Sequence, residues 1–294
     1  MTTYPNAHYL AEVDWLAAHL KDANVVVLDA RFDVRTDAKG HYHEVAGRDG
    51  FLKGHIAGAQ FVDLKADLAC PKNPTCIIGA DAFAALMGRL GVTGASTVVV
   101  YDDKGGVWAA RLWWALRYYG HDNVKMLNGG LGAWRAAGHS LQTDVTAPEP
   151  AQFTAKAQTN LRVEKHDVLA AIDDKDTVII DALPKPFYYG KAVLYPQCRK
   201  GHVPGAYNVP AEYNLDPKTG RVRPLADLQD LWKHVTDKPA RRYITYCGGG
   251  VFASFALFIL ALMGYGNAAL YDASWTEWGA DDSLPIETGA SPIT

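Results

Sequence analysis

One stretch of the sequence occurs twice, as GHIAGA at residues 54–59 and as GHVPGA at residues 201–206. Two further blocks repeat around it in the same order: VVVLDA at 25–30 with TVIIDA at 177–182, and NVKMLNGGLGAW at 123–134 with NAALYDASWTEW at 267–278. Three blocks in one order indicate that the chain contains two copies of one domain. The spacing between partner blocks drifts along the chain, which indicates loops of unequal length in the two copies.

Each copy alternates between short β-branched runs and stretches with helical apolar spacing. The first copy predicts strands at 24–29, 97–101 and 123–127 and helices at 81–90 and 109–119. The second predicts strands at 178–181, 243–246 and 268–271 and helices at 225–235 and 253–263. Alternating strands and helices are typical of a parallel sheet covered on both faces. The predicted fold class is α/β, with a mostly parallel sheet flanked by helices in each copy.

A stretch of low apolar content separates the two copies. Residues 141–163 include Pro148 and Pro150 and have no clear period, as expected of a linker. We therefore expect a first domain over residues 1–140 and a second over residues 164–294. The length of 294 residues also suits two domains better than one core.

The composition is that of an ordinary globular protein, with 49% hydrophobic and 21% charged residues. The formal net charge is −3 and basic residues are spread along the chain, so neither nucleic acid nor a membrane surface is expected as a partner. The first residues lack the pattern of a signal peptide, and four cysteines do not make a disulfide scaffold. We expect a cytoplasmic protein; the sequence leaves its oligomeric state open.

The second copy carries a cysteine in a glycine-rich turn, Tyr246-Cys247-Gly248-Gly249-Gly250, between a predicted strand and a predicted helix. The backbone N–H groups of such a turn point inward, and the following helix adds the positive end of its dipole. This arrangement favours an anion on the sulfur. We therefore expect the pKa of the Cys247 thiol to fall toward neutrality and the residue to act as a nucleophile. The alternative is a structural cysteine in a strand-to-helix turn.

These blocks together resemble the tandem-domain rhodanese family, whose members include thiosulfate and 3-mercaptopyruvate sulfurtransferases. The resemblance covers residues 10–288 and is most specific in GHVPGA at 201–206, in the Cys247 loop, and in YDASWTEW at 271–278. It implies two tandem rhodanese-like domains, an inactive first one and a catalytic second one, with the substrate in the cleft between them. It also implies an enzyme that moves sulfane sulfur from thiosulfate or 3-mercaptopyruvate to a thiol or cyanide.

The first copy has no cysteine in the corresponding turn. Alignment of the repeats without gaps puts Asp103 at the position of Cys247, and Lys104 interrupts the glycine run. A carboxylate cannot carry sulfane sulfur, so we expect one active centre per chain. The fold evidently does not need a cysteine at this turn, which favours a chemical role for Cys247.

The resemblance implies double displacement through a persulfide on Cys247. The anionic sulfur would lie among backbone N–H groups of the loop, an arrangement that works like an oxyanion hole. The residues expected to form this anion nest are Gly248, Gly249, Gly250, Val251, Phe252 and Ala253. Neither an organic cofactor nor a metal is expected, since the persulfide itself carries the sulfur.

The sulfur donor stays open, because the loop differs from both kinds of relative. Loops of the thiosulfate type carry Arg and Lys after the cysteine, and loops of the mercaptopyruvate type carry hydroxyl groups. This loop has Gly248 and Gly249 there instead. The small-molecule donor and its thiol or cyanide acceptor are the only partners that the sequence predicts.

Anion binding is left to cations outside the loop. Arg199 and Lys200 precede the second GHVPGA block, and an arginine there can hold a carboxylate or sulfonate at two points. The alternative is a pair of solvated surface cations. Lys185 is a further candidate for substrate binding, and Trp108 is expected to pack the domain interface or to form a wall of the cleft above Cys247.

His55 and His202 recur in both copies, including the copy without a nucleophile, so we expect them to fix a turn by hydrogen bonding. Asp29 and Asp181 are interpreted in the same way. Cys198 precedes Arg199, and two roles are open for it: resolving a Cys247 persulfide or forming a regulatory disulfide.

The sequence leaves two other function classes as alternatives. Dual-specificity phosphatases share this architecture but need an arginine six residues after the cysteine, where this chain has Ala253. A rhodanese-like binding module without catalysis is the other alternative, favoured by the bare loop. The retained Cys247 argues against it, since binding does not need a thiol.

Overall fold

The described residues of the computed structural model are 3–36, 42–71, 73–237 and 240–289, and they fall into two compact units. The N-terminal unit consists of residues 7–158 together with 215–222. The C-terminal unit consists of residues 3–6, 159–214 and the described residues from 223 onward. Residues 141–158, predicted as part of the linker, lie in the N-terminal unit. The domain limits 1–140 and 164–294 stay predictions.

The segment 215–222 belongs to the N-terminal unit although it lies within the second repeat. Its ends pair through an antiparallel bridge between Leu215 and Val222. The Val222 N–H donates to Asn128 Oδ1 at 3.0 Å, and Arg221 Nη1 lies 2.7 Å from Glu12 Oε2. The repeat pattern does not predict that residues 215–222 join the N-terminal unit, because this depends on contacts between residues far apart in the sequence.

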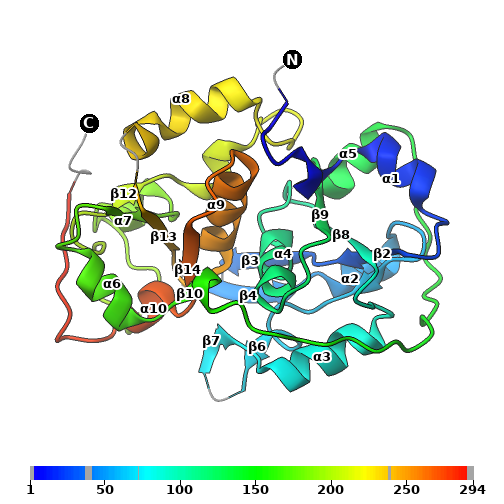
Figure 1. Ribbon diagram of the computed structural model, residues 1–294, viewed down its shortest axis with the longest axis horizontal. Helices are drawn as coiled ribbons and strands as arrows, with labels where there is room; N and C mark the ends of the chain where they lie inside the picture. Colours follow the sequence, from blue (N-terminus) through cyan, green and yellow to red (C-terminus); the bar gives the residue numbers. More distant parts are fainter. Residues whose placement is uncertain (1–2, 37–41, 72, 238–239, 290–294) are drawn as a thin grey trace. The chain divides into compact units, whose positions relative to one another are not determined.

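The N-terminal unit contains a five-stranded parallel sheet with the strand order β1-β9-β8-β2-β5 (Figure 1). Its strands are β1 Leu10–Ala11, β2 Val25–Asp29, β5 Gln60–Phe61, β8 Thr97–Tyr101 and β9 Val124–Leu127. The inner strands are continuous apolar runs because helices cover a parallel sheet on both faces. Val98, Val99 and Val100 of β8 are fully buried.

The C-terminal unit repeats this topology in its own five-stranded parallel sheet, with the order β10-β14-β13-β11-β12. Its strands are β10 Arg162–Val163, β11 Thr177–Asp181, β12 Tyr207–Asn208, β13 Arg242–Tyr246 and β14 Ala268–Tyr271. The strand order matches the first sheet position by position. This confirms the predicted α/β class and the duplication.

Helices follow the strands in both units. Those of the N-terminal unit are η1 Ala7–Tyr9, α1 Val13–His19, α2 Arg48–Lys53, α3 Ala80–Arg89, α4 Ala109–Tyr118 and α5 Gly130–Ala136. Those of the C-terminal unit are η2 Thr159–Leu161, α6 Lys165–Ala171, α7 Lys185–Tyr188, η3 Ala211–Asn214, α8 Leu225–Thr236, α9 Val251–Leu262 and α10 Ser274–Trp278. The helices predicted at 81–90, 109–119, 225–235 and 253–263 correspond to α3, α4, α8 and α9.

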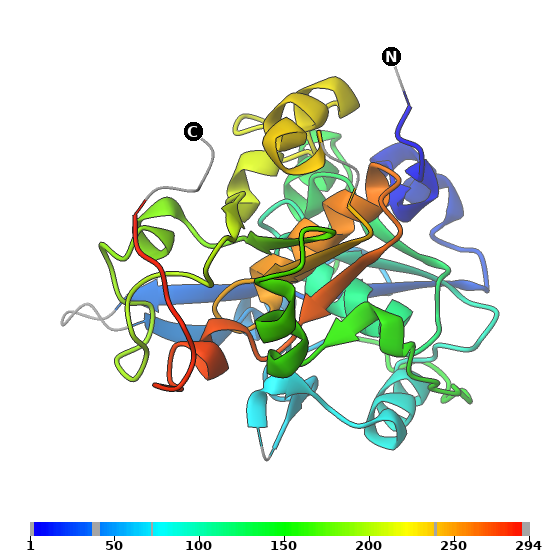
Figure 2. The same ribbon diagram turned by 60° about the vertical axis from the view of Figure 1, so that its left-hand side comes forward.

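Helix α9 is buried along nearly its whole length. It packs along β13 and β14, as Figure 2 shows for the orange helix. Every residue from Ala253 to Leu262 is buried, in keeping with a sequence that is apolar on all sides. A helix buried in this way keeps its first turn fixed against the sheet, and the loop before it is fixed with it.

Two hairpins of the N-terminal unit have no counterpart among the described strands of the other unit. One consists of β3 Phe32–Thr36 and β4 Tyr42–Ala46, the other of β6 Ala69–Cys70 and β7 Asn73–Ile77. Neither was predicted. Cys70 in the second hairpin is half-buried, as is Cys76.

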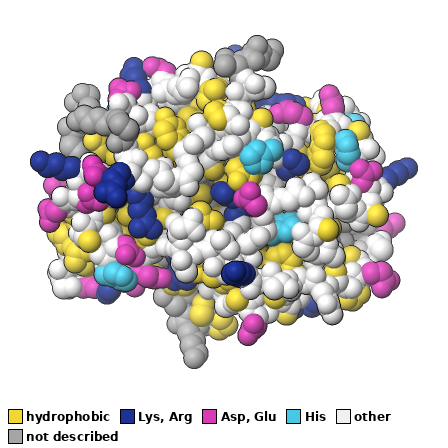
Figure 3. Space-filling view, in the orientation of Figure 1, with side chains coloured by type: hydrophobic (Ala, Val, Ile, Leu, Met, Phe, Trp, Pro, Cys, Tyr) yellow, Lys and Arg dark blue, Asp and Glu magenta, His cyan; other side chains and the backbone are white. Residues whose placement is uncertain are grey.

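The surface carries charges of both signs. On the face in Figure 3, Lys and Arg side chains are interspersed with Asp and Glu. Within the ranges given above, no helix combines the length and the apolar character needed to cross a bilayer.

Candidate functional site

The loop between β13 and α9 holds the predicted nucleophile. Strand β13 ends at Tyr246 and α9 begins at Val251, so Cys247 and three glycines turn the chain. Gly250 has a φ of 80°, in the left-handed region where glycine has no steric penalty. Cys247 is only 3% exposed. The loop therefore presents a buried thiol at the amino end of a twelve-residue helix.

Backbone N–H groups of this loop point at the Cys247 sulfur. Burial of the thiol raises its pKa above the ordinary value, while hydrogen bonds from the N–H groups of Ala253, Gly249 and Gly250 act in the opposite direction. The negative charge of Asp181 raises it further. The expectation of a lowered pKa is therefore wrong for the resting thiol, because burial outweighs the N–H groups.

Residues 274–276 support the loop from its outer side. The Cys247 N–H donates to Ser274 Oγ at 3.1 Å, and the Trp275 N–H donates to Cys247 O at 3.0 Å. Gly248 O accepts from both the N–H (2.9 Å) and the hydroxyl (2.7 Å) of Thr276. The sequence identifies this block as a repeat and as a specific part of the family resemblance. Its support of the loop was missed, because these bonds join segments far apart in the chain.

The equivalent loop of the N-terminal unit holds a carboxyl group in its nest of N–H groups. Asp102 Oδ1 accepts from the N–H groups of Lys104 and Gly106, both at 2.8 Å. Oδ2 accepts from those of Trp108 at 2.7 Å and Ala109 at 2.9 Å. Burial raises the pKa of this carboxyl, and the four N–H groups act against it. The loop thus directs four backbone N–H donors at the two oxygens of one side chain, an arrangement that favours an anion there.

The counterpart of Cys247 is thus Asp102, and the sequence-based assignment to Asp103 is wrong. Tyr246 pairs with Asp181 in one sheet as Tyr101 pairs with Asp29 in the other. Asp102 follows Tyr101, and its backbone carbonyl accepts the Leu131 N–H at 2.8 Å. In the other repeat the backbone carbonyl of Cys247 accepts the N–H of Trp275 in the same way. Between the paired tyrosine and the repeated Val-Trp-Ala or Val-Phe-Ala segment, the first loop is one residue longer (Tyr101 to Val107 against Tyr246 to Val251), which an alignment without gaps cannot register.

The comparisons with known proteins agree with this duplicated architecture. Residues 12–137 and 164–281 match the Rhodanese-like domain. The chain belongs to the rhodanese family. This rhodanese is 34% identical to 3-mercaptopyruvate sulfurtransferase from Escherichia coli, over 93% of this chain and 96% of the relative. It is 33% identical to a putative thiosulfate sulfurtransferase, SseA, from Mycobacterium leprae, over 99% of this chain and 95% of the relative.

A solved structure shows the same fold. The crystal structure of SseA from Escherichia coli is similar to this rhodanese with a TM-score of 0.80 and 30% identity, over 93% of this chain and 99% of that chain. The names of the relatives contain two different donors, so they do not choose between them.

A buried carboxyl near the nucleophile differs between the two repeats of this rhodanese. In the N-terminal unit Asp29 forms a buried ion pair with Arg31 at 2.7 Å. In the C-terminal unit Leu183 stands at the place of that arginine, and Asp181 Oδ1 accepts its N–H at 2.7 Å. Burial raises the pKa of Asp181 to about 7, although hydrogen bonds from the Leu183 N–H and the Tyr246 hydroxyl favour the charged form.

The two repeated histidines fix turns, as predicted. His55 Nδ1 lies 2.8 Å from Phe51 O, and His202 Nδ1 lies 2.8 Å from Tyr188 O. Each imidazole stacks on the aromatic ring of the same residue, with the centroids 4.0 and 3.7 Å apart. Their place in both repeats follows from this structural task.

Arg199 uses its guanidinium within the C-terminal unit. Nε donates to Gly279 O at 3.2 Å, Nη1 to Leu284 O at 3.0 Å, and Nη2 to Trp278 O at 3.1 Å and to Asp281 O. Most of its donors are therefore bound to carbonyl oxygens near the end of the described chain. Binding of a substrate anion by Arg199 stays a prediction, and these contacts give the side chain a structural task.

The other predicted substrate residues lie in different surroundings. Lys200 is exposed, and Lys185 is exposed with its Nζ 5.5 Å from the centre of the Tyr213 ring. Trp108 is 8% exposed and packs near Phe32 in the N-terminal unit, besides donating its backbone N–H to Asp102. Their roles toward a substrate stay predictions.

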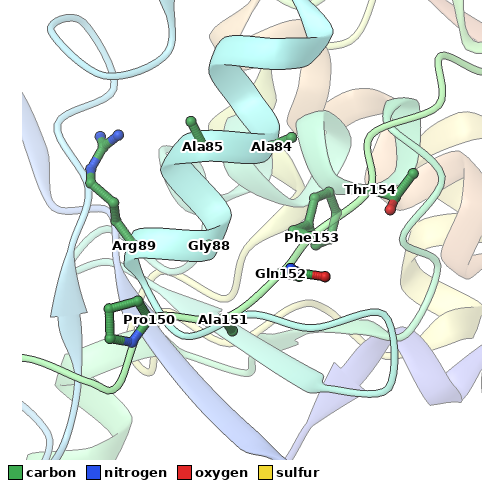
Figure 4. A pocket seen from close by; sticks show the side chains of 9 residues that line it. All are labelled: Ala84, Ala85, Gly88, Arg89, Pro150, Ala151, Gln152, Phe153 and Thr154. Carbon is green, nitrogen blue, oxygen red and sulfur yellow. The ribbon is translucent and has the colours of Figure 1, made fainter.

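A separate pocket of about 420 Å³ lies in the N-terminal unit (Figure 4). It is formed by α3 and the segment 150–154, and its lining contains no cysteine, histidine or carboxylate. It thus offers no group for covalent or acid–base chemistry. The part of the chain that the structure describes contains no cluster of three or more metal-ligating side chains.

Proposed function

We propose that the protein is a sulfurtransferase that carries sulfane sulfur on Cys247, which takes it from thiosulfate or 3-mercaptopyruvate and passes it to a thiol or cyanide. Membership of the rhodanese family and the sulfurtransferase names of its relatives support this activity. The assignment of the sulfur donor and of the Cys247 persulfide depends on the residues of the site.

The Asp102 carboxyl in the N-terminal unit is the observation that carries the proposal. A carboxylate oxygen is three bonds from Cα, and the outer sulfur of a cysteine persulfide is also three bonds from its Cα. Asp102 takes the place of Cys247 in its repeat and its oxygens accept N–H groups of the loop. We infer that the Cys247 loop binds the outer, anionic sulfur of a persulfide in the same manner.

The reaction then proceeds in two balanced steps. With thiosulfate, the Cys247 thiolate attacks the outer sulfur, a new S–S bond forms, and sulfite leaves with the electron pair of the old one. With 3-mercaptopyruvate the C–S bond breaks instead, and the thiol proton of the donor ends on the methyl group of pyruvate. In the second step an acceptor thiolate or cyanide attacks the outer sulfur, and Cys247 leaves as thiolate.

The backbone of the loop stabilises this intermediate. The N–H groups of Gly249, Gly250 and Ala253 already reach the sulfur of the resting thiol. The N–H of Phe252 is proposed to join them, since the N–H of Trp108 at its place reaches the carboxyl in the other repeat. Gly248 and Val251 stay predicted members of the nest. N–H groups fixed before the reaction need no rearrangement as the charge forms.

Mass spectrometry of the intact protein tests the proposal. After incubation with each donor and no acceptor, we expect an adduct of about 32 Da, one sulfur atom, that maps to Cys247 and is lost on addition of cyanide. Cys198→Ser is the matched control, since it is a buried cysteine of the same unit, and it should keep the adduct. An adduct retained in Cys247→Ser, or none with any donor including inorganic polysulfide, would refute the proposal.

A further inference from the structure

At two positions of the Cys247 loop the backbone conformation does not require glycine. Gly250 has a φ in the left-handed region, but Gly248 and Gly249 lie outside it. Side chains at these two positions are therefore compatible with the turn. The reason for glycine must be sought in the space around them.

The space beside Gly248 is filled by a neighbouring segment. A Cβ atom at this position would overlap Leu194 Cδ2, and would lie 3.5 Å from both Cε2 and the hydroxyl oxygen of Tyr195. Leu194 and Tyr195 belong to the stretch between α7 and β12 of the same unit. These side chains occupy the place that a residue-248 side chain would take. The loop has no side chain of its own at position 248, but the side chains of Leu194 and Tyr195 pack against it in the folded unit.

The space beside Gly249 is open. A Cβ atom here would lie 4.0 Å from the Tyr195 hydroxyl oxygen, and apart from residues 248–250 themselves no other atom of the described chain comes within 4 Å of it. The N–H of this glycine points at the Cys247 sulfur. A vacant position thus adjoins the nucleophile, with a phenol hydroxyl at its side.

We propose that the open space beside Gly249 receives the body of the sulfur donor, and that Tyr195 is a specificity-determining residue whose hydroxyl hydrogen-bonds an oxygen of that donor. This inference rests on the proposed function. A phenol is an uncharged donor and suits a carbonyl or a single carboxylate. The donor class it selects is a small organic thiol with such an oxygen, as in 3-mercaptopyruvate.

The same surroundings disfavour a dianionic inorganic donor. Positions 247 to 253 contain no Arg or Lys, and the Leu194 side chain makes the wall beside Gly248 apolar. Removing two charges from water without a compensating cation in the loop is costly. We therefore expect thiosulfate to be the poorer donor, for a physical reason that the loop sequence alone does not supply.

Steady-state kinetics with both donors tests the assignment. In Tyr195→Phe we expect kcat/KM for 3-mercaptopyruvate to fall about tenfold, the effect of one lost hydrogen bond, and kcat/KM for thiosulfate to change less than about threefold. Gly249→Lys should reverse the preference, because its ammonium group would enter the open space and attract the dianion. Tyr207→Phe, another half-buried tyrosine of the same unit, is the control and should change neither value.

A separate loading experiment distinguishes failure of the subsite assignment from failure of the proposed function. Loading of Cys247 by inorganic polysulfide, which has no carbonyl or carboxylate, measures the nucleophile alone. If wild-type protein does not load, the proposed function fails and the subsite with it. If wild-type and Tyr195→Phe both load, but Tyr195→Phe alters the two donors equally or not at all, the subsite assignment is overturned while the sulfurtransferase stands.

Discussion

The buried carboxyl of Asp181 gives a testable prediction, and its counterpart in the other repeat supplies the matched control. Its counterpart Asp29 faces Arg31 at 2.7 Å, whereas Asp181 has Leu183 in that place. Replacement by asparagine keeps an oxygen for the Leu183 N–H and removes the charge. The change Asp181→Asn therefore isolates the cost of a buried carboxylate without a cation.

The magnitude follows from the pKa, which burial raises from 3.8 to about 7. Ionising Asp181 in the folded protein then costs about 4 kcal/mol more than in the unfolded chain. Between pH 4 and pH 7 the folded protein holds this proton and the unfolded chain does not, so the contribution of Asp181 to stability falls as the pH rises and is constant above pH 7. Relative to wild type, Asp181→Asn should gain up to about 4 kcal/mol between pH 4 and pH 8.

Denaturant unfolding at several pH values measures this difference, with hydrogen exchange of β11 and β13 to assign it to the C-terminal unit. Asp29→Asn is the matched control and should behave in the opposite way. It leaves the Arg31 charge buried and unpaired, so we expect a loss of about 3–5 kcal/mol throughout this pH range. A difference between wild type and Asp181→Asn that did not vary with pH would refute the reasoning.

Three further changes separate the roles assigned above. Gly249→Pro removes an N–H that reaches the Cys247 sulfur, so we expect near-complete loss of sulfur transfer with the circular dichroism spectrum retained; normal turnover would contradict the nest. Arg199→Lys loses the hydrogen bonds to the carbonyl oxygens of residues 278–284, and we expect the free energy of unfolding to fall by about 2–3 kcal/mol. A raised KM without that loss of stability would instead indicate that Arg199 binds the substrate. Cys198→Ala should leave turnover and peroxide sensitivity unchanged, since the Cys198 Sγ bonds to Trp275 O; a change in either would assign it a redox role.

The long elements of the fold were predictable from the sequence. The strand predicted at 97–101 is β8, and the predicted helix at 225–235 is α8 with one residue more. Buried parallel strands appear as uninterrupted β-branched runs, and amphipathic helices keep their period, so both carry a strong local signal. Edge strands of two residues, such as β5 and β12, have no such signal, and the insertion at 215–222 depends wholly on distant contacts.

The site was predictable in its backbone but not in its electrostatics. A cysteine followed by glycines between a strand and a helix is a local pattern, and it located the loop. The direction of the Cys247 pKa shift depends on burial, which other segments of the fold decide. The partners of Arg199 lie about eighty residues further along the chain, and Leu194 and Tyr195 reach the loop from a stretch without recognisable pattern.

The raised pKa of Cys247 is consistent with sulfur transfer once the two repeats are compared. The Asp102 loop holds a carboxyl group whose oxygens lie three bonds from Cα, and it binds that group with four N–H donors. Burial raises the pKa of both groups, but the sulfur of a resting thiol lies only two bonds from its Cα, so a second sulfur is needed to extend as far as those oxygens. We therefore propose that the loop is complementary to the persulfide rather than to the free thiol. Stabilising the intermediate more than the resting state is what a catalyst requires, since equal stabilisation of both would leave the barrier unchanged.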